Sequence, residues 1–178
     1  MKLSFNLYRS ALLLGLFFLT PVVKLFAQNE CSTAGTLTSS TACNNTNINL
    51  SSATASSGIP LGCAAAGTYN DYWYQFTAVS TTHTITLSNI GTRITNPRIQ
   101  LYSGSCGSLT SLACSSSPHT SLTQTGLTVG ATYYVRISQY GAFGSTGNYR
   151  ADVCITHPVA PPANDDCSGS VLLTSGTA

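Results

Sequence analysis

Apolar and polar residues alternate in short stretches along most of the chain. In the segments 83–87 and 133–137 one face is apolar and the other polar, which is typical of strands in an antiparallel sheet with one buried side. No helical period persists for three turns. Nine strands are predicted between turns rich in Gly, Asn, Ser and Pro, at residues 35–39, 46–51, 71–78, 83–88, 98–102, 108–114, 121–127, 132–138 and 148–155. This pattern predicts an all-β, antiparallel β-sandwich of jelly-roll type.

The first 27 residues do not follow this pattern. Lys2 and Arg9 precede the apolar run 11–19, and the small residue Ala27 offers a cleavage point before Gln28. An uncleaved membrane anchor is the alternative, but the run is shorter than the roughly 20 residues that span a bilayer. We therefore predict a signal peptide at residues 1–27 and a secreted or cell-surface protein with no membrane span after its removal.

The end of the chain repeats its beginning. Residues 167–178 match residues 31–42 in register at Cys, Ser, Leu, Thr, Ser, Thr and Ala, which indicates tandem domains. We predict a β-sandwich module at residues 28–156, a Pro-rich linker at 157–163, and the first strand of a second, truncated copy at 164–178. Adjacent domains of a longer chain are then the first expected partners.

Charge narrows the range of other partners. Residues 28–178 contain no lysine, and four arginines against five carboxylates leave a net charge of −1. Binding to nucleic acid needs a basic surface, so no nucleic-acid partner is expected.

Seven cysteines in an exported chain indicate disulfides. Cys106 and Cys114 bracket a short hairpin, so we predict that they pair. The other four cysteines of the module allow three pairings, among which we favour Cys43 with Cys63 and Cys31 with Cys154, because the latter ties the first strand to the last. Cys167 occupies the repeat position of Cys31 and is left for the second copy. No Cys-x-x-Cys pair is present, so zinc is not indicated.

No catalytic arrangement can be recognised. The chain has neither a Gly-x-Ser-x-Gly elbow nor a His-Glu-x-x-His motif. We expect His119 to be a solvated loop residue and His83 to face solvent at the start of its strand. The module is predicted to be non-catalytic.

Aromatic residues offer a binding surface. Trp73 lies on the strand face opposite Tyr72, Tyr74 and Phe76, so its indole could face outward and stack on a sugar ring. The alternative is that a loop or a neighbouring strand covers it. Arg136 either adds a hydrogen-bonding edge or pairs with Asp152. The full set of candidate binding residues is Trp73, Tyr69, Tyr140, Phe143 and Arg136.

Four motifs in order resemble bacterial pre-peptidase C-terminal (PPC) β-sandwich repeat domains of secreted and surface Bacteroidetes proteins. They are Asp71-Tyr72-Trp73-Tyr74-Gln75-Phe76-Thr77, the segment 101–114 with its two cysteines, Thr132-Tyr133-Tyr134-Val135-Arg136-Ile137, and Gly147-Asn148-Tyr149. The resemblance implies a non-catalytic sandwich, carried in tandem or beside peptidases, other hydrolases and adhesin-like repeats.

The resemblance also raises the question of calcium. Many relatives carry acidic residues after the equivalent of Cys114, whereas Ser115, Ser116 and Ser117 follow here. Calcium needs several oxygen ligands, and the remaining candidates for it are Glu30, Asn70 and Asp71, with Asp152 further along the chain. The alternative is that Asn29-Glu30 and Asn70-Asp71 cap turns where strands begin.

These observations together predict a non-catalytic accessory or adhesion module that binds an extracellular glycan or matrix protein. Two alternatives remain open. The module is an accessory domain of a secreted peptidase or other hydrolase whose catalytic domain lies outside this chain, or it is a structural spacer without a ligand.

Overall fold

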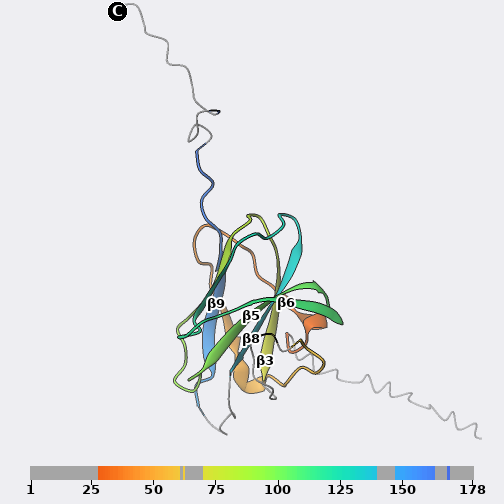
Figure 1. The fold of residues 1–178 in the computed structure, drawn as a ribbon. Helices are drawn as coiled ribbons and strands as arrows, with labels where there is room; N and C mark the ends of the chain where they lie inside the picture. Colours follow the sequence, from red (N-terminus) through yellow and green to blue (C-terminus); the bar gives the residue numbers. More distant parts are fainter. Residues whose placement is uncertain (1–27, 61, 63–69, 140–146, 163–167, 169–178) are drawn as a thin grey trace, which may run out of the picture.

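The computed structural model describes residues 28–60, 62, 70–139, 147–162 and 168, which form a two-sheet β-sandwich (Figure 1). Nine strands and two short 3-10 helices occur within these residues. They are η1 (Cys31–Thr33), β1 (Gly35–Thr36), β2 (Thr46–Asn49), η2 (Leu50–Ser52), β3 (Asp71–Thr77), β4 (His83–Ser88), β5 (Pro97–Ser105), β6 (Ser108–Cys114), β7 (Ser121–Gln124), β8 (Thr132–Gln139) and β9 (Arg150–Thr156). Each predicted strand is present, and the predicted fold class is confirmed.

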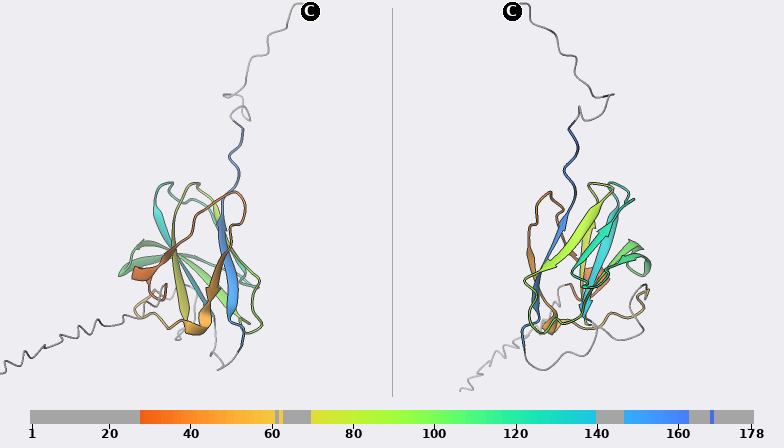
Figure 2. Two further views of the ribbon diagram at one scale, coloured as in Figure 1. Left: turned by 180° about the vertical axis from the view of Figure 1, so that it is seen from behind. Right: turned by 60° about the vertical axis from the view of Figure 1, so that its left-hand side comes forward.

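The strands form a five-stranded sheet of order β1-β3-β8-β5-β6 and a four-stranded sheet of order β2-β9-β4-β7. All neighbours pair antiparallel except β1 and β3, which pair parallel. Figure 2 shows the two layers from two further directions. Apart from β5 and β6, the neighbouring strands do not follow one another in the chain, so the fold depends on contacts between distant parts of the sequence.

The main core lies between the sheets and comes from every second residue of the paired strands. Tyr74 and Phe76 of β3, Ile85 of β4, and Val135 and Ile137 of β8 are buried in it. Burying a side chain of this size contributes about 1.5–3 kcal/mol. The apolar positions of the alternating segments are therefore buried between the sheets, as predicted.

His83 departs from the prediction that it faces solvent. Its side chain is 0% exposed, and its ring lies 5.1 Å from the ring of Phe76. The reason is the strand period, because His83 shares one face of β4 with Ile85 and Leu87, which are core residues.

The predicted disulfide pairings are wrong. Cys31 pairs with Cys106, with 5.6 Å between their Cα atoms, and Cys43 pairs with Cys154 at 5.5 Å. These bonds replace the predicted pairs Cys106–Cys114, Cys43–Cys63 and Cys31–Cys154. Cys114 is also disulfide-bonded, while Cys63 lies outside the described residues.

The geometry of one hairpin explains why Cys106 and Cys114 do not meet. Ser105 pairs with Ser108, so Cys106 sits in the turn, whereas Cys114 pairs with Gln100 at the far end of β6. A seven-residue strand such as β6 spans roughly 20 Å. The two cysteines are close in sequence, but the length of β6 keeps them apart in space.

The two ends of the sandwich carry different segments. In Figures 1 and 2 the described part of the linker, residues 157–162, leaves at one end, while η2 lies at the other. The predicted signal peptide and, apart from Ser168, the predicted second copy lie outside the described residues. Among the residues that are described, no helix is long and apolar enough to cross a membrane.

Candidate functional site

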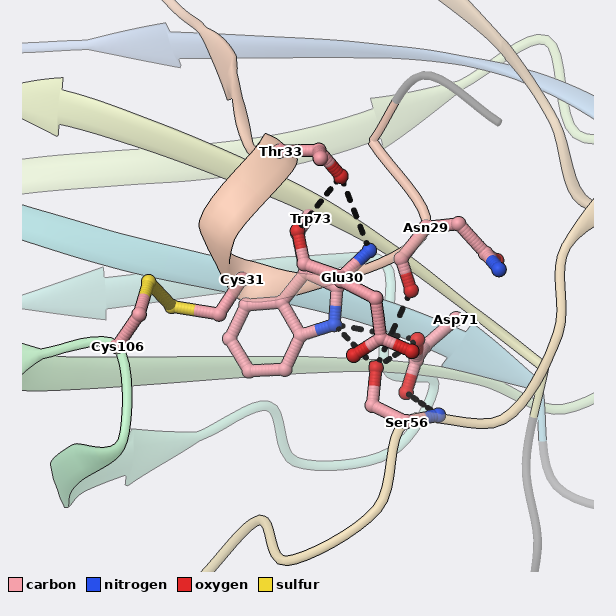
Figure 3. The surroundings of a disulfide bond; sticks show 8 residues. All are labelled: Asn29, Glu30, Cys31, Thr33, Ser56, Asp71, Trp73 and Cys106. Atoms are coloured by element: carbon pink, nitrogen blue, oxygen red, sulfur yellow. Dashed lines mark hydrogen bonds between the residues drawn. A yellow bond between two sulfur atoms is a disulfide. The ribbon is translucent and has the colours of Figure 1, made fainter. Parts of the chain in front are cut away.

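The N-terminal strap, residues 28–34, covers the outer face of the five-stranded sheet. The backbone N–H of Trp73 donates to the carbonyl oxygen of Gln28 at 2.7 Å. Asn29 Oδ1 accepts the backbone N–H of Thr54 at 2.5 Å, which ties the strap to the loop before β3. The disulfide from Cys31 to Cys106 fastens the strap to the β5–β6 hairpin, as Figure 3 shows.

Trp73 lies beneath this strap. Its side chain is 0% exposed, and its ring lies 5.6 Å from that of Tyr102. The indole Nε1 donates to Ser56 Oγ at 2.8 Å and to Asp71 Oδ1 at 3.1 Å (Figure 3). Of the two positions considered for Trp73, the covered one is observed, because the strap and the loop before β3 leave no face of the indole for a sugar ring.

Arg136 is part of the same buried layer and does not pair with Asp152. Its Nε donates to Asp71 Oδ2 at 2.6 Å and its Nη1 donates to Gln100 Oε1 at 3.0 Å. Burial raises the pKa of the Asp71 carboxyl, while the Arg136 charge and the hydrogen bonds from Ser56 oppose that rise. Arg136 is thus a structural ion-pair partner with no exposed edge for a ligand.

The calcium candidates do not come together as ligands. Asp71 faces a guanidinium, Glu30 is exposed on the strap, and Asn70 forms an isolated bridge with Ala55. No group of three His, Cys, Asp or Glu side chains within the described residues is placed to hold a metal ion. Glu30 and Thr33 instead bond to each other around η1, since the Glu30 N–H donates to Thr33 Oγ1 at 3.3 Å.

The other aromatic candidates, Tyr69, Tyr140 and Phe143, lie outside the described residues, so their role stays a prediction. His119 follows Pro118 in the β6–β7 loop and is half-buried, with Nδ1 2.7 Å from the Ser115 carbonyl oxygen. This contact replaces the fully solvated position predicted for it.

Two of the clefts on the described surface are large enough to hold a sugar-sized ligand. The first, the strap cleft, has a volume of about 400 Å³ and runs between the strap, a loop and the β5–β6 turn. Its walls are Glu30, Cys31, Ser32, Ser57–Pro60 and Cys106–Leu109. Glu30 is its charged group, and Ile59, Pro60 and Leu109 give it an apolar side.

The second, the end cleft, has a volume of about 530 Å³ and lies where β2 ends and β9 begins. It is lined by Asn49, Ser51, Gly147, Asn148, Tyr149 and Arg150. These residues come from two segments about 100 positions apart, joined by the antiparallel pairing in which Asn49 stands opposite Arg150.

The backbone of the end cleft is held from both sides. On one side the N–H of Leu50 donates to the carbonyl oxygen of Tyr149 at 3.0 Å, and the Tyr149 side chain is buried in the core. On the other side the N–H of Gly91 donates to the carbonyl oxygen of Arg150 at 2.7 Å, and that of Arg93 donates to Asn148 O at 3.1 Å. The polar side chains therefore project from a fixed frame.

Hydrogen bonds inside the cleft orient its amide groups. Asn49 Oδ1 accepts the N–H of Ser51 at 3.2 Å, and Asn148 Oδ1 accepts the N–H of Arg150 at 3.0 Å. Arg150 Nη1 donates to Asn47 Oδ1 at 3.2 Å. As far as the chain is described, the Nδ2 groups of Asn49 and Asn148 and the other N–H groups of Arg150 have no protein partner, so they are donors available to a ligand.

The end cleft was not predicted from the sequence. Its one local signal is Gly147-Asn148, a turn-forming pair of polar character directly before a strand. In space the cleft lies at the end of the sandwich that carries η2, opposite the linker (Figures 1 and 2).

Comparison with known proteins agrees with this picture of a binding module. Residues 27–151 match a family described as galactose binding domain-like and associated with type IX secretion. The match supports the expected class, a β-sandwich domain of secreted Bacteroidetes proteins, but it is not a match to PPC domains. The association with type IX secretion confirms the predicted secreted or cell-surface location. No curated protein matches the chain. The chain belongs to the galactose binding domain-like family of type IX secretion-associated proteins, a non-catalytic family.

Proposed function

We propose that the module is a secreted, non-catalytic adhesion or accessory domain that binds galactose-containing glycans in the end cleft. The observation that carries this proposal is the set of unpartnered amide and guanidinium donors in that cleft, in a domain of the galactose binding domain-like family. A sugar presents adjacent hydroxyl groups, and planar amide and guanidinium groups offer paired donors to them.

The composition of the two clefts favours the end cleft. The strap cleft supplies one carboxylate and several serine hydroxyls around a disulfide, whereas the end cleft adds two asparagine amides, a serine hydroxyl and an arginine. A specific site for a polar ligand needs a few convergent polar groups on a rigid frame. The backbone bonds to Leu50 and Gly91 provide that frame.

The position of the end cleft suits an accessory or adhesion role. Its lining includes Ser51 of η2, and η2 lies at the end of the sandwich opposite the one where residues 157–162 leave (Figure 1). Ligand can therefore reach it without displacing the segment that follows. The cleft is open and shallow, so a single site would bind weakly, and repeated copies on one surface would raise the overall avidity by about 10²–10⁴-fold.

Titration of galactose-containing oligosaccharides into the module, followed by calorimetry, tests the proposal. Asn148→Ala and Ser51→Ala remove groups of the end cleft and are each expected to weaken binding about tenfold. Ser57→Ala is the matched serine control in the strap cleft and is expected to leave affinity unchanged.

Two results would overturn the proposal. Loss of affinity in Ser57→Ala with none in Ser51→Ala would place the ligand in the strap cleft. Absence of binding to any galactose-containing glycan by the folded module would favour a structural spacer.

A further inference from the structure

We infer that the end cleft selects acidic sugars, those bearing a carboxylate or a sulfate ester, over neutral galactose. This inference rests on the proposed function and adds the class of ligand to it. Its basis is the placement of the module's arginines relative to its carboxylates.

Two of the four arginines of the module gather at the end cleft. Arg150 is exposed and lines it. Arg93 is exposed and lies against Gly147, since a Cβ at Gly147 would stand 2.2 Å from Arg93 Cγ and 2.6 Å from Arg93 Nε. The cleft therefore has one guanidinium in its wall and a second beside its rim.

The other two arginines are engaged elsewhere. Arg136 is buried in its ion pair with Asp71. Arg98 donates from Nη1 to Asn96 Oδ1 at 2.6 Å and is half-buried at the start of β5. Exposed positive charge in the described module is thus concentrated at the end cleft.

No carboxylate lines the end cleft in the part of the chain that the structure describes. Glu30 belongs to the strap cleft, and Asp71 is buried beneath the strap. Asp152 is the carboxylate nearest to Arg150 in the sequence. Its oxygens accept hydrogen bonds from Asn47 Nδ2 at 3.0 Å and Asn89 Nδ2 at 2.6 Å. Those amides, rather than Arg150, satisfy its oxygens.

The remaining N–H groups of Arg150 suit an oxyanion. A guanidinium binds a carboxylate or a sulfate through paired, charge-assisted hydrogen bonds, which are about twice as strong as neutral ones. Neutral hydroxyls would use the same donors without the added attraction between opposite charges. The asparagine amides recognise hydroxyl groups that neutral and acidic sugars share.

Calorimetric titration with methyl galactoside, methyl galacturonoside and galactose 6-sulfate at low and physiological salt tests the inference. At least one acidic sugar is expected to bind about tenfold more tightly than the neutral one at low salt. The advantage is expected to shrink as salt rises, because the arginines are exposed and their charges are screened over about 8–10 Å. Whichever acid binds more tightly identifies the preferred anion.

Charge-neutralising variants separate a local effect from net charge. Arg150→Gln is expected to abolish the preference for acidic sugars and Arg93→Gln to reduce it. Arg98→Gln changes the net charge equally at a residue that does not line the cleft, and it is expected to keep the preference.

The failure of the inference is distinct from that of the proposed function. Equal, salt-independent binding of all three sugars would overturn the acidic preference while galactose binding stands. Preference retained in Arg150→Gln would overturn the role given to this cleft. Binding of none of the sugars would overturn the proposed function and the inference with it.

Discussion

Arg136 Nε and Asp71 Oδ2 lie 2.6 Å apart on the outer face of the five-stranded sheet, with side chains only 4% and 0% exposed. An outer face of a sandwich usually meets water. Here the strap covers this face and buries Trp73 and Tyr102, which project from it. The domain thus has a second, small core with a charged pair inside it. Such a pair is costly to break, because one partner alone would be an uncompensated buried charge.

Arg136→Leu is predicted to lower the free energy of unfolding by about 3–5 kcal/mol, since it leaves the Asp71 carboxylate without its guanidinium. Urea denaturation followed by the fluorescence of Trp73, the one tryptophan in the chain, measures the change. The exposed control Arg150→Leu should stay within about 0.5 kcal/mol of the wild type. The double variant Asp71→Leu/Arg136→Leu should recover part of the loss, and similar losses in Arg136→Leu and Arg150→Leu would argue against a buried pair.

The disulfide between Cys31 and Cys106 is predicted to hold the strap over Trp73. Cys31→Ser/Cys106→Ser should cost about 2–4 kcal/mol of stability, and the native-state emission of Trp73 should move to longer wavelength as water reaches the indole. Cys43→Ser/Cys154→Ser is the matched control, because Cys154 belongs to β9 of the four-stranded sheet whereas Trp73 belongs to β3 of the five-stranded sheet. It should cost similar stability without the emission shift, and a shift in both variants would contradict the role of the strap.

Stability is predicted to fall in acid because of His83. Burial, with a smaller contribution from the neighbouring His157, lowers the pKa of His83 below the ordinary value of 6.5. The unfolded chain therefore takes up this proton at a higher pH than the folded module. The stabilisation is complete above about pH 6.5 and is lost progressively below it.

Denaturation midpoints measured across this pH range check the prediction. His83→Phe, which keeps the contact with Phe76, should flatten the profile. An unchanged slope in His83→Phe would assign the acid sensitivity to other groups.

Gly147 is predicted to support ligand binding because its lack of a side chain leaves room for Arg93. Its φ is +146°, and a Cβ there would collide with Arg93. Gly147→Ala should therefore move Arg93 and weaken glycan binding severalfold. Gly130→Ala is a matched control, because Gly130 has φ +85° with no atom within 4 Å of an added Cβ.

Both glycine variants should lose stability of about 1 kcal/mol from backbone strain, measured by thermal denaturation. Only Gly147→Ala should also lose affinity, measured by calorimetry. Equal affinities in the two variants would mean that Arg93 and Gly147 take no part in the site.

The strand pattern could be predicted from the sequence because it depends on local alternation. The predicted bounds of β4 and β6 match those observed, and His83 could have been placed in the core from its shared period with Ile85. Alternation also placed Trp73 correctly on the face opposite Tyr74.

The covering of Trp73 could not be predicted in the same way. It depends on a strap about 40 residues earlier in the chain and on a disulfide across 75 positions, neither of which alternation encodes. The end cleft also depends on segments that are distant in sequence. It forms only when the register of β2 with β9 brings Asn49 opposite Arg150. No turn connects β2 to β9 directly, so the local sequence does not fix that register.

The most direct test of glycan binding at the end cleft is the map of backbone amide shifts in a ¹⁵N-labelled module titrated with a galactose-containing oligosaccharide. The account predicts that the shifts concentrate at residues 49–51 and 147–150 and at Gly91 and Arg93, which hold that backbone. Shifts concentrated at residues 30–32, 57–60 and 106–109 would contradict it by placing the ligand in the strap cleft. No shifts at saturating sugar would contradict glycan binding altogether.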